Sequence, residues 1–131
     1  MKKQSTRLTR INDEIARVAA DTIRSEMSDP RIASVVSVMR AETTSDMKYC
    51  KIYVSVLADE EKQKETMAAL KSGTGFVRRR IAEVINLRQT PEITFVFDDS
   101  IEYGMRMRKL IEDVNRNVSS DTNNETDNET D

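Results

Sequence analysis

A short basic segment follows two closely spaced glycines near the middle of the chain. Residues 71–75 read Lys-Ser-Gly-Thr-Gly, and residues 78–80 are three consecutive arginines. Glycine has no Cβ, so the backbone at Gly73 and Gly75 can bend and approach a ligand closely. The guanidinium forks of arginine match phosphate oxygens. The segment therefore predicts binding of a polyanion; the alternative is a helix corner with a solvated basic face.

The arginines should open a helix that follows the glycine break. Cations in the first turn of a helix are unfavourable for its dipole, whereas the free N–H groups there attract anions. A polyanion that neutralises the three arginines would remove this unfavourable interaction with the helix dipole. Helix geometry directs Arg79 away from the core and leaves Arg78 and Arg80 beside the apolar stripe, with all three guanidinium groups in reach of solvent.

The two glycines should also shape the backbone between the helices. We expect at least one of them to adopt a left-handed conformation, with Gly75 the better candidate because Phe76 must then turn towards the core. On that basis Gly75→Ala should destabilise the protein.

Other candidate chemistry is weak. The chain has no histidine, and Cys50 is its single cysteine, so neither an internal disulfide nor a zinc site is expected. The Asp98–Asp99 pair fits a helix cap better than a carboxylate dyad. No histidine is present to activate a serine or threonine, and the glycine segment lacks the Gly-Lys-Ser/Thr ending of a phosphate-binding loop. We therefore expect no enzyme, no cofactor, no metal and no small-molecule substrate.

One aromatic pair could contact bases. Tyr49 and Tyr53 lie on one face of a predicted strand with Lys51 between them. Aromatic side chains with basic neighbours can stack nucleobases. Packing against side chains of the neighbouring strand is the interpretation that we favour.

The hydrophobic pattern supplies the elements that position these residues. Apolar residues at spacings of three and four predict helices, and the alternation from Cys50 to Val56 predicts a strand with one buried face. The predicted elements are a helix over Thr6–Ser28, strands over Val35–Glu42 and about Tyr49–Val56, a helix from Asp59, a helix containing Val77, Ile81, Val84 and Ile85, a strand over Ile93–Phe97, and a helix from Ser100 to about Val114. This order predicts an α+β fold with the helices on one face of a small mixed sheet.

Charge divides the chain unevenly. Its 131 residues include 21 basic and 23 acidic side chains; residues 117–131 contain five of the acids and no base, so residues 1–116 carry a net charge of +3. The polar segment from Asn117 should be a disordered acidic tail. No apolar run suggests a signal peptide or a membrane span, which favours a cytoplasmic protein without a membrane partner.

Several separated segments of the chain resemble bacterial ribosome-binding factor A, over roughly Arg7 to Gly104. The segments that carry the resemblance are residues 10–15 (RINDEI), 29–31 (DPR), 54–57 (VSVL), 69–78 (ALKSGTGFVR), 87–95 (LRQTPEITF) and 98–104 (DDSIEYG). The family usually has Ala-x-Gly where this chain has Gly73-Thr74-Gly75, so Gly75 matches the family's fixed glycine. Gly73→Ala restores the family residue and should be neutral or mildly stabilising.

The resemblance implies a single KH-like domain over residues 1–116, with three strands and an interrupted pair of helices. It implies a non-enzymatic factor, monomeric when free, that binds the rRNA of the small ribosomal subunit, assists rRNA processing and late subunit maturation, and is linked to growth at low temperature. From the basic segments and the resemblance together, we assign RNA binding to Lys71, Ser72, Gly73, Thr74, Gly75, Arg78, Arg79, Arg80, Arg88, Arg7, Arg10 and Arg31. The alternatives are a stand-alone α+β module that binds protein without RNA, and a small enzyme with an unrecognised site.

Overall fold

The chain forms two compact units in a computed structural model that describes residues 6–125. The first unit ends at Asp98 and the second begins at Asp99, and each is described by itself. In chain order the first unit contains α1 (Thr6–Ser25), β1 (Val36–Thr43), β2 (Tyr49–Val56), α2 (Glu60–Ser72), α3 (Thr74–Val84) and β3 (Glu92–Phe97). This order, and the α+β class, confirm the prediction. Within residues 6–125, no helix combines the length and apolar character that a membrane crossing needs.

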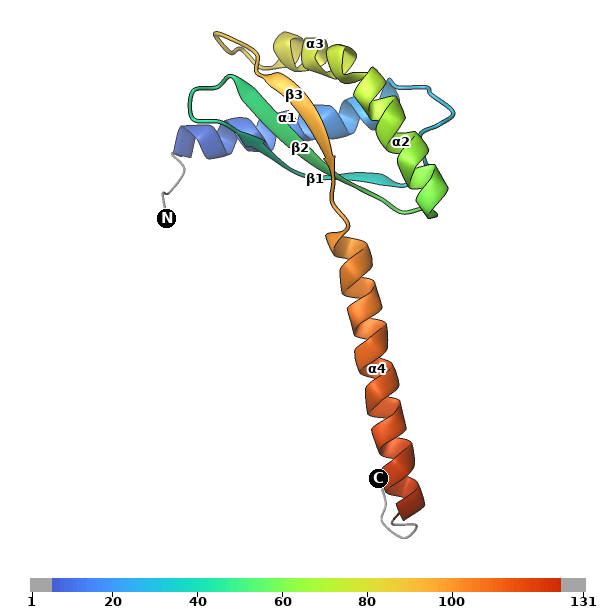
Figure 1. The fold of residues 1–131 in the computed structure, drawn as a ribbon. Coiled ribbons are helices and arrows are strands. Elements are labelled where there is room, and N and C mark those ends of the chain that lie inside the picture. The colour runs from blue at the N-terminus through green and yellow to red at the C-terminus, as the bar shows by residue number, and fades with distance from the viewer. Residues whose placement is uncertain (1–5, 126–131) are drawn as a thin grey trace. The chain divides into compact units, whose positions relative to one another are not determined.

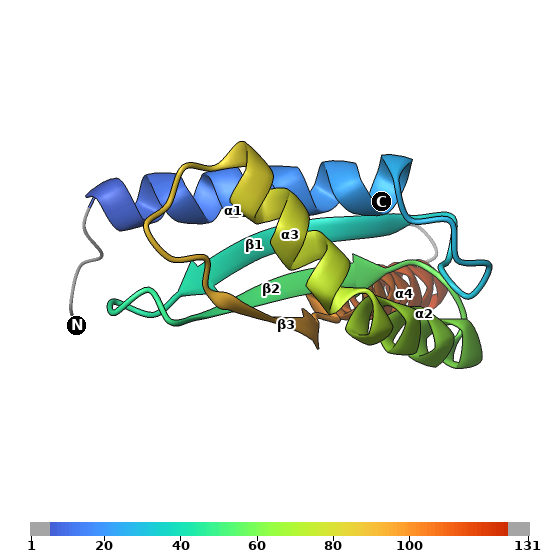
Figure 2. The ribbon, with the colours of Figure 1, turned by 90° about the horizontal axis from the view of Figure 1, so that it is seen from above.

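The three strands form one mixed sheet in the order β1-β2-β3 (Figure 1). β1 pairs antiparallel with β2, and β3 pairs parallel with β2 after the crossover through α2 and α3. A β-bulge between Val38 and Arg40 interrupts the register of β1, an edge strand. Seen from above, α3 crosses over the sheet between α1 and α2 (Figure 2).

The core lies between these helices and the inner face of the sheet. Ile15 of α1, Ile52 of β2, Leu70 of α2 and Ile81 of α3 are fully buried and belong to one apolar cluster. The buried face predicted for β2 is confirmed, because Cys50, Ile52, Val54 and Val56 are all buried, although Ser55 on the opposite face is buried as well. Burial raises the pKa of the Cys50 thiol, which behaves as a small apolar side chain.

Two buried polar side chains fix loops to this core. The Asn12 side-chain oxygen accepts a hydrogen bond of 3.0 Å from the backbone N–H of Thr43 and so ties α1 to the end of β1. The Thr66 hydroxyl accepts from the N–H of Ala33 at 3.0 Å and donates to the carbonyl of Arg31 at 3.1 Å. The segment between α1 and β1 is therefore held against α2, because a buried polar group without a partner is costly.

Helix α1 ends three residues before the predicted Ser28. The carbonyl of Thr22 accepts hydrogen bonds from both Glu26 and Met27, which closes the last turn. Helix α2 begins as predicted, because the side chain of Asp59 accepts a hydrogen bond of 2.8 Å from the N–H of Lys62.

A single residue, Gly73, separates α2 from α3. Its φ is −92°, and no glycine in the described residues has a positive φ, so the expectation of a left-handed glycine is wrong. Gly73 instead lies under a side chain: a Cβ at this position would overlap the terminal methyl of Met27, which follows α1 and would have to shift. At Gly75, already inside α3, a Cβ would meet open space.

The second unit is helix α4 (Ser100–Glu125), which begins after Asp99. The carbonyl of Asp99 accepts a hydrogen bond of 2.8 Å from the N–H of Tyr103, consistent with the predicted helix start. The predicted end near Val114 is too early, since the helix continues to Glu125 and includes residues 117–125 that were expected in the tail. Residues 126–131, with the rest of that tail, lie outside the described residues. We keep the lack of stable structure from Asn117 in solution as a prediction.

The glycines at the α2–α3 junction should respond differently to alanine. Gly75→Ala should leave the free energy of unfolding unchanged or raise it by up to about 1 kcal/mol, because it places a better helix former in open space. Gly73→Ala forces Met27 aside and should be the less stable variant, losing at most about 1 kcal/mol because the thioether is flexible. Urea unfolding measures both, and the difference should vanish in a Met27→Ala background. A larger loss at Gly75 would contradict this account.

Removing residues 117–131 should leave the thermal midpoint of the protein unchanged. This segment has one apolar residue, Val118, so little apolar burial offsets the entropy of ordering it. Calorimetry of the full chain and of a chain ending at Arg116 makes the comparison. A drop of several degrees would show that the segment packs stably on the protein.

Candidate nucleic-acid interface

The three arginines lie in the second turn of α3 rather than in its first. The helix begins at Thr74, four residues before Arg78, so the expectation that the arginines open it is wrong. A helix dipole acts mainly within the terminal turn. The helix dipole therefore gives no argument for an anionic ligand. The argument depends on which of the guanidinium groups already have partners within the protein.

Arg80 is engaged by acidic side chains. Its Nη1 lies 2.7 Å from Glu83 of the same helix, and its Nε lies 3.1 Å from Glu26 at the end of α1, at ion-pair distance but without hydrogen-bond geometry. The hydrogen bond to Glu83, followed by the charge of Glu26, raises the pKa of Arg80. Arg80 thus fastens α3 to α1, and its guanidinium group is less available to a ligand than predicted.

Arg78 and Arg79 have exposed side chains. Arg78 donates a hydrogen bond of 2.8 Å to the carbonyl of Thr90, in the loop that leads to β3. Arg79 makes no side-chain hydrogen bond or ion pair with any described residue. Both line a shallow hollow of about 420 Å³ with Gly75, Ala82 and Thr90. Of the three arginines, Arg79 has the most available charge.

The two hydroxyl groups of the glycine segment, residues 71–75, are already used in hydrogen bonds to the protein's own backbone. Ser72 donates to the carbonyl of Ala68 at 3.1 Å, and Thr74 donates to the carbonyls of Leu70 and Lys71 at 3.2 and 2.7 Å. The Thr74 hydroxyl, together with the N–H of Gly73, thus satisfies carbonyls in the last turn of α2, and the Ser72 hydroxyl bonds back to its own helix. Lys71 is exposed, and its ammonium group has no partner among residues 6–125.

The remaining predicted residues lie on other elements. Arg31 is paired with Asp29, with Nη2 2.7 Å from Oδ2, and this hydrogen-bonded guanidinium group lowers the pKa of Asp29 to about 2. Arg88 is exposed in the loop between α3 and β3, and Arg7 and Arg10 are exposed on the first turns of α1. None of these last three has a side-chain partner in the described part of the chain.

The outer face of the sheet holds a charged network around Tyr53. The Arg40 guanidinium group lies 3.9 Å above the Tyr53 ring and pairs with Glu42 and Asp98 at 3.2 Å each, while the Tyr53 hydroxyl donates to Glu42 at 3.0 Å. That hydrogen bond is the largest cause that raises the pKa of Tyr53. Cross-strand packing is therefore confirmed for Tyr53, whereas Tyr49 remains 56% exposed.

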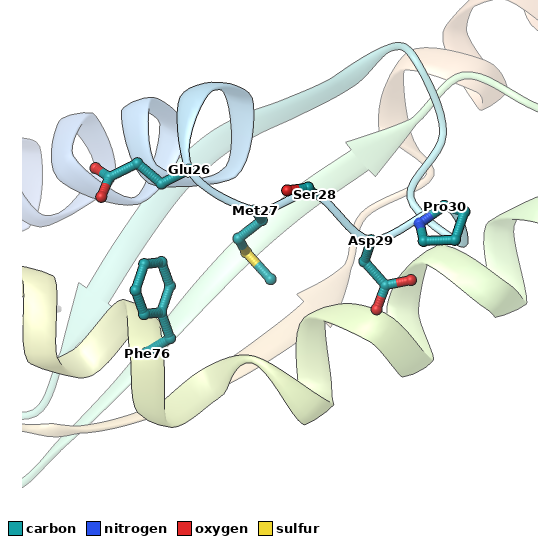
Figure 3. A pocket seen from close by; sticks show the side chains of 6 residues that line it. All are labelled: Glu26, Met27, Ser28, Asp29, Pro30 and Phe76. Atoms are coloured by element: carbon teal, nitrogen blue, oxygen red, sulfur yellow. The ribbon is translucent and has the colours of Figure 1, made fainter.

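Phe76 does not turn into the core as expected. It is half-buried and stands apart from the apolar cluster, lining a surface hollow with Met27 and Pro30 (Figure 3). The sequence carried a signal for this, because the buried stripe of α3 passes through Val77 and Ile81 and leaves position 76 at its border. The sequence analysis also did not predict Glu26 and Glu83, the two acidic partners of Arg80.

Comparison with known proteins decides the family. The family model described as ribosome-binding factor A matches residues 7–111. The chain belongs to this family. A ribosome-binding factor A of Lachnospira eligens is 51% identical over 114 residues, which cover 87% of this chain and 88% of the relative. One from Agathobacter rectalis is 47% identical over 121 residues, which cover 92% of this chain and 100% of the relative.

Solved structures of the ribosome-binding factor A family share the fold. The crystal structure from Thermus thermophilus aligns with a TM-score of 0.60 at 19% identity, covering 68% of this chain and 93% of that one. A coordinate set for the Thermus thermophilus factor, fitted into an electron cryomicroscopy map of its complex with the 30S subunit, aligns with a TM-score of 0.58 at 18% identity. It covers 70% of this chain and 96% of that one.

Proposed function

We propose that this protein binds the rRNA of the small ribosomal subunit and assists the late maturation of that subunit. Membership of the ribosome-binding factor A family is the observation that carries the proposal. The complex of the Thermus thermophilus relative with the 30S subunit indicates which ribosomal particle to test. Such a factor acts in ribosome biogenesis, in the cytoplasm, as a monomer before it binds.

The exposed basic side chains support RNA as the binding partner. Lys71, Arg79 and Arg88 lie on α2, on α3 and in the loop after α3, and none has a charge partner among the described residues. Arginine and lysine contacts to phosphate release counterions and supply most of the sequence-independent affinity for nucleic acid. The KH-like element order and the glycine junction fit the same role, in which the backbone at Gly75 approaches a phosphate group closely.

The described residues offer no set of side chains that favours catalysis over binding. Among the described residues no group of three or more carboxylate or cysteine side chains lies close enough to hold a metal ion. The pKa of Asp29 is lowered to about 2 by hydrogen bonds from Arg31, an arrangement that an ordinary surface ion pair produces. A module that binds only protein remains the rival function, and salt-dependent binding to RNA separates the two, because phosphate contacts release counterions.

The protein should co-sediment with free small subunits rather than with translating ribosomes. An assembly factor must leave its particle before translation begins, so a gradient of cell extract at low salt should place it in the small-subunit fraction. Immunodetection across the gradient measures the distribution. Recovery only at the top of the gradient would refute the proposed function.

Arg79 should contribute to the salt dependence of RNA binding more than Arg80. Arg79→Gln removes a free charge and should reduce the slope of log affinity against log salt by about one unit. Arg80→Gln is the matched control: its charge is already offset by Glu26 and Glu83, so the slope should change less while the thermal midpoint falls. Binding to a single-stranded RNA is measured across a salt series. Equal slopes for wild type and an Arg78→Gln/Arg79→Gln variant would show that the basic face is only solvated.

A further inference from the structure

A groove runs between the second half of α1 and the first half of β1, along the edge of the sheet opposite β3. It measures about 590 Å³, and Ile23, Met27 and Ile32 give it apolar walls. None of the residues to which we assign RNA binding lines it. The groove is therefore a surface that the proposed contact with RNA leaves unused.

The edge strand beside this groove presents backbone groups that have no partner in the sheet. The N–H of Leu57 donates to the carbonyl of Val35 at 3.0 Å, and the register makes Ser37 the next residue of β1 that faces β2 in this way. In an antiparallel pair, the residues between such positions direct their N–H and C=O groups away from the neighbouring strand. Val36 and Val38 therefore point these groups out of the sheet edge, where the described residues supply no further strand.

The side chains at this edge make the groove continuous with the inner face of the sheet. Val36 and Val38 pack against the apolar cluster on the side of α1. A strand added to β1 would direct every second side chain to the same face, and so into the groove beside α1. Edge strands with such a neighbouring groove bind extended peptide segments, in which main-chain hydrogen bonds give affinity and alternate side chains give specificity.

The charges around the groove are balanced. Arg24 at its rim pairs with Asp21, and Asp29 pairs with Arg31. Residues 32–39, which include the β1 side of the groove, have no charged side chain. An uncharged segment meets a surface of matching polarity here, whereas a polyanion finds no cation that lacks a partner among the described residues that line the groove.

The shape of the edge selects a short segment that brings no helix of its own. The β-bulge between Val38 and Arg40 limits regular pairing to Ser34–Val38. A second copy of this chain fits poorly, because its own α1 runs along its β1 and would enter the same space (Figure 2). Residues 1–5 span at most about 18 Å, whereas the 20 residues of α1 that separate them from the groove end extend about 30 Å.

We propose that this groove binds one extended, uncharged segment of a protein of the small ribosomal subunit, which adds a fourth strand to the sheet along Ser34–Val38. The inference rests on the proposed function and adds a protein contact to the contact with rRNA. The N–H and C=O groups of Val36 and Val38 bind the backbone of the segment. Its alternate apolar side chains enter the groove beside Ile23 and Met27.

A proline at the edge tests the main-chain hydrogen bonds. Val36→Pro removes the outward N–H and is tolerated at a sheet edge, because that group donates no bond to β2. It should weaken binding of the full-length protein to purified free small subunits roughly threefold to tenfold, the range of about one net hydrogen bond. Val36→Thr is the matched control: it also loses the valine side chain but keeps the N–H, and should bind like wild type. The salt dependence of binding should stay the same in both variants, because these hydrogen bonds release no counterions.

A photocrosslink identifies the chemistry of the occupant independently of the proline variant. A benzophenone amino acid in place of Ser34, at the lip of the groove, should join the protein covalently to one protein of the purified small subunit on irradiation. The product should be destroyed by protease and resist ribonuclease. The same amino acid in place of Lys51, exposed on the outer face of the sheet, is the matched control and should not give this product.

The outcomes separate this inference from the proposed function. If the wild-type protein does not bind small subunits at low salt, the proposed function itself is wrong. If it binds, but position 34 crosslinks to rRNA, to a second copy or to no component of the subunit, the strand contact is wrong and the function stands. Equal binding of wild type and a folded Val36→Pro variant would also overturn the strand contact. If Val36→Pro lowers the thermal midpoint, the crosslink alone decides.

Discussion

Packing of the segment after α1 against the junction of α2 and α3 positions the residues of the candidate interface. The methyl group of Met27 occupies the space that a Cβ at residue 73 would need, so the segment after α1 packs directly on the junction of α2 and α3. This close approach brings the end of α1 beside the first turns of α3. It allows Glu26 to reach Arg80 and leaves Phe76 at the edge of a surface hollow instead of in the core.

Charge pairing, more than net charge, decides which cations face a ligand. Three arginines are adjacent in the sequence, yet Arg80 holds two acids, Arg78 caps a loop carbonyl and Arg79 has no partner among the described residues. A charge that is already paired releases few counterions when a phosphate approaches, because its field is compensated. Within residues 78–80, Arg80 therefore joins α3 to the end of α1, whereas Arg78 and Arg79 are more available for binding.

Local sequence patterns predicted most of the fold, but they did not predict which of the arginines are paired within the protein. The alternation along β2, the Asp59 cap and the glycine break between α2 and α3 each depend on residues close in sequence, and each was predicted with its element. The Glu26–Arg80 pair joins residues 54 positions apart, and Phe76 lines a hollow with Met27 from the loop after α1. Such contacts follow from tertiary packing. The extension of α4 was missed because a helix can continue through polar residues without an apolar stripe to mark it.

The bulge in β1 affects how readily a strand of another chain can pair with this edge of the sheet. Residues 32–39 of the chain carry no charge and include four β-branched residues, and part of this stretch forms an edge strand of the sheet. An uninterrupted edge of this kind is a template on which further chains can add strands and grow into aggregates. The bulge breaks the hydrogen-bonding repeat between Val38 and Arg40, and the charged Arg40 follows directly. The β1 edge of the sheet is therefore a poorer template for a strand of a neighbouring copy than an uninterrupted edge would be.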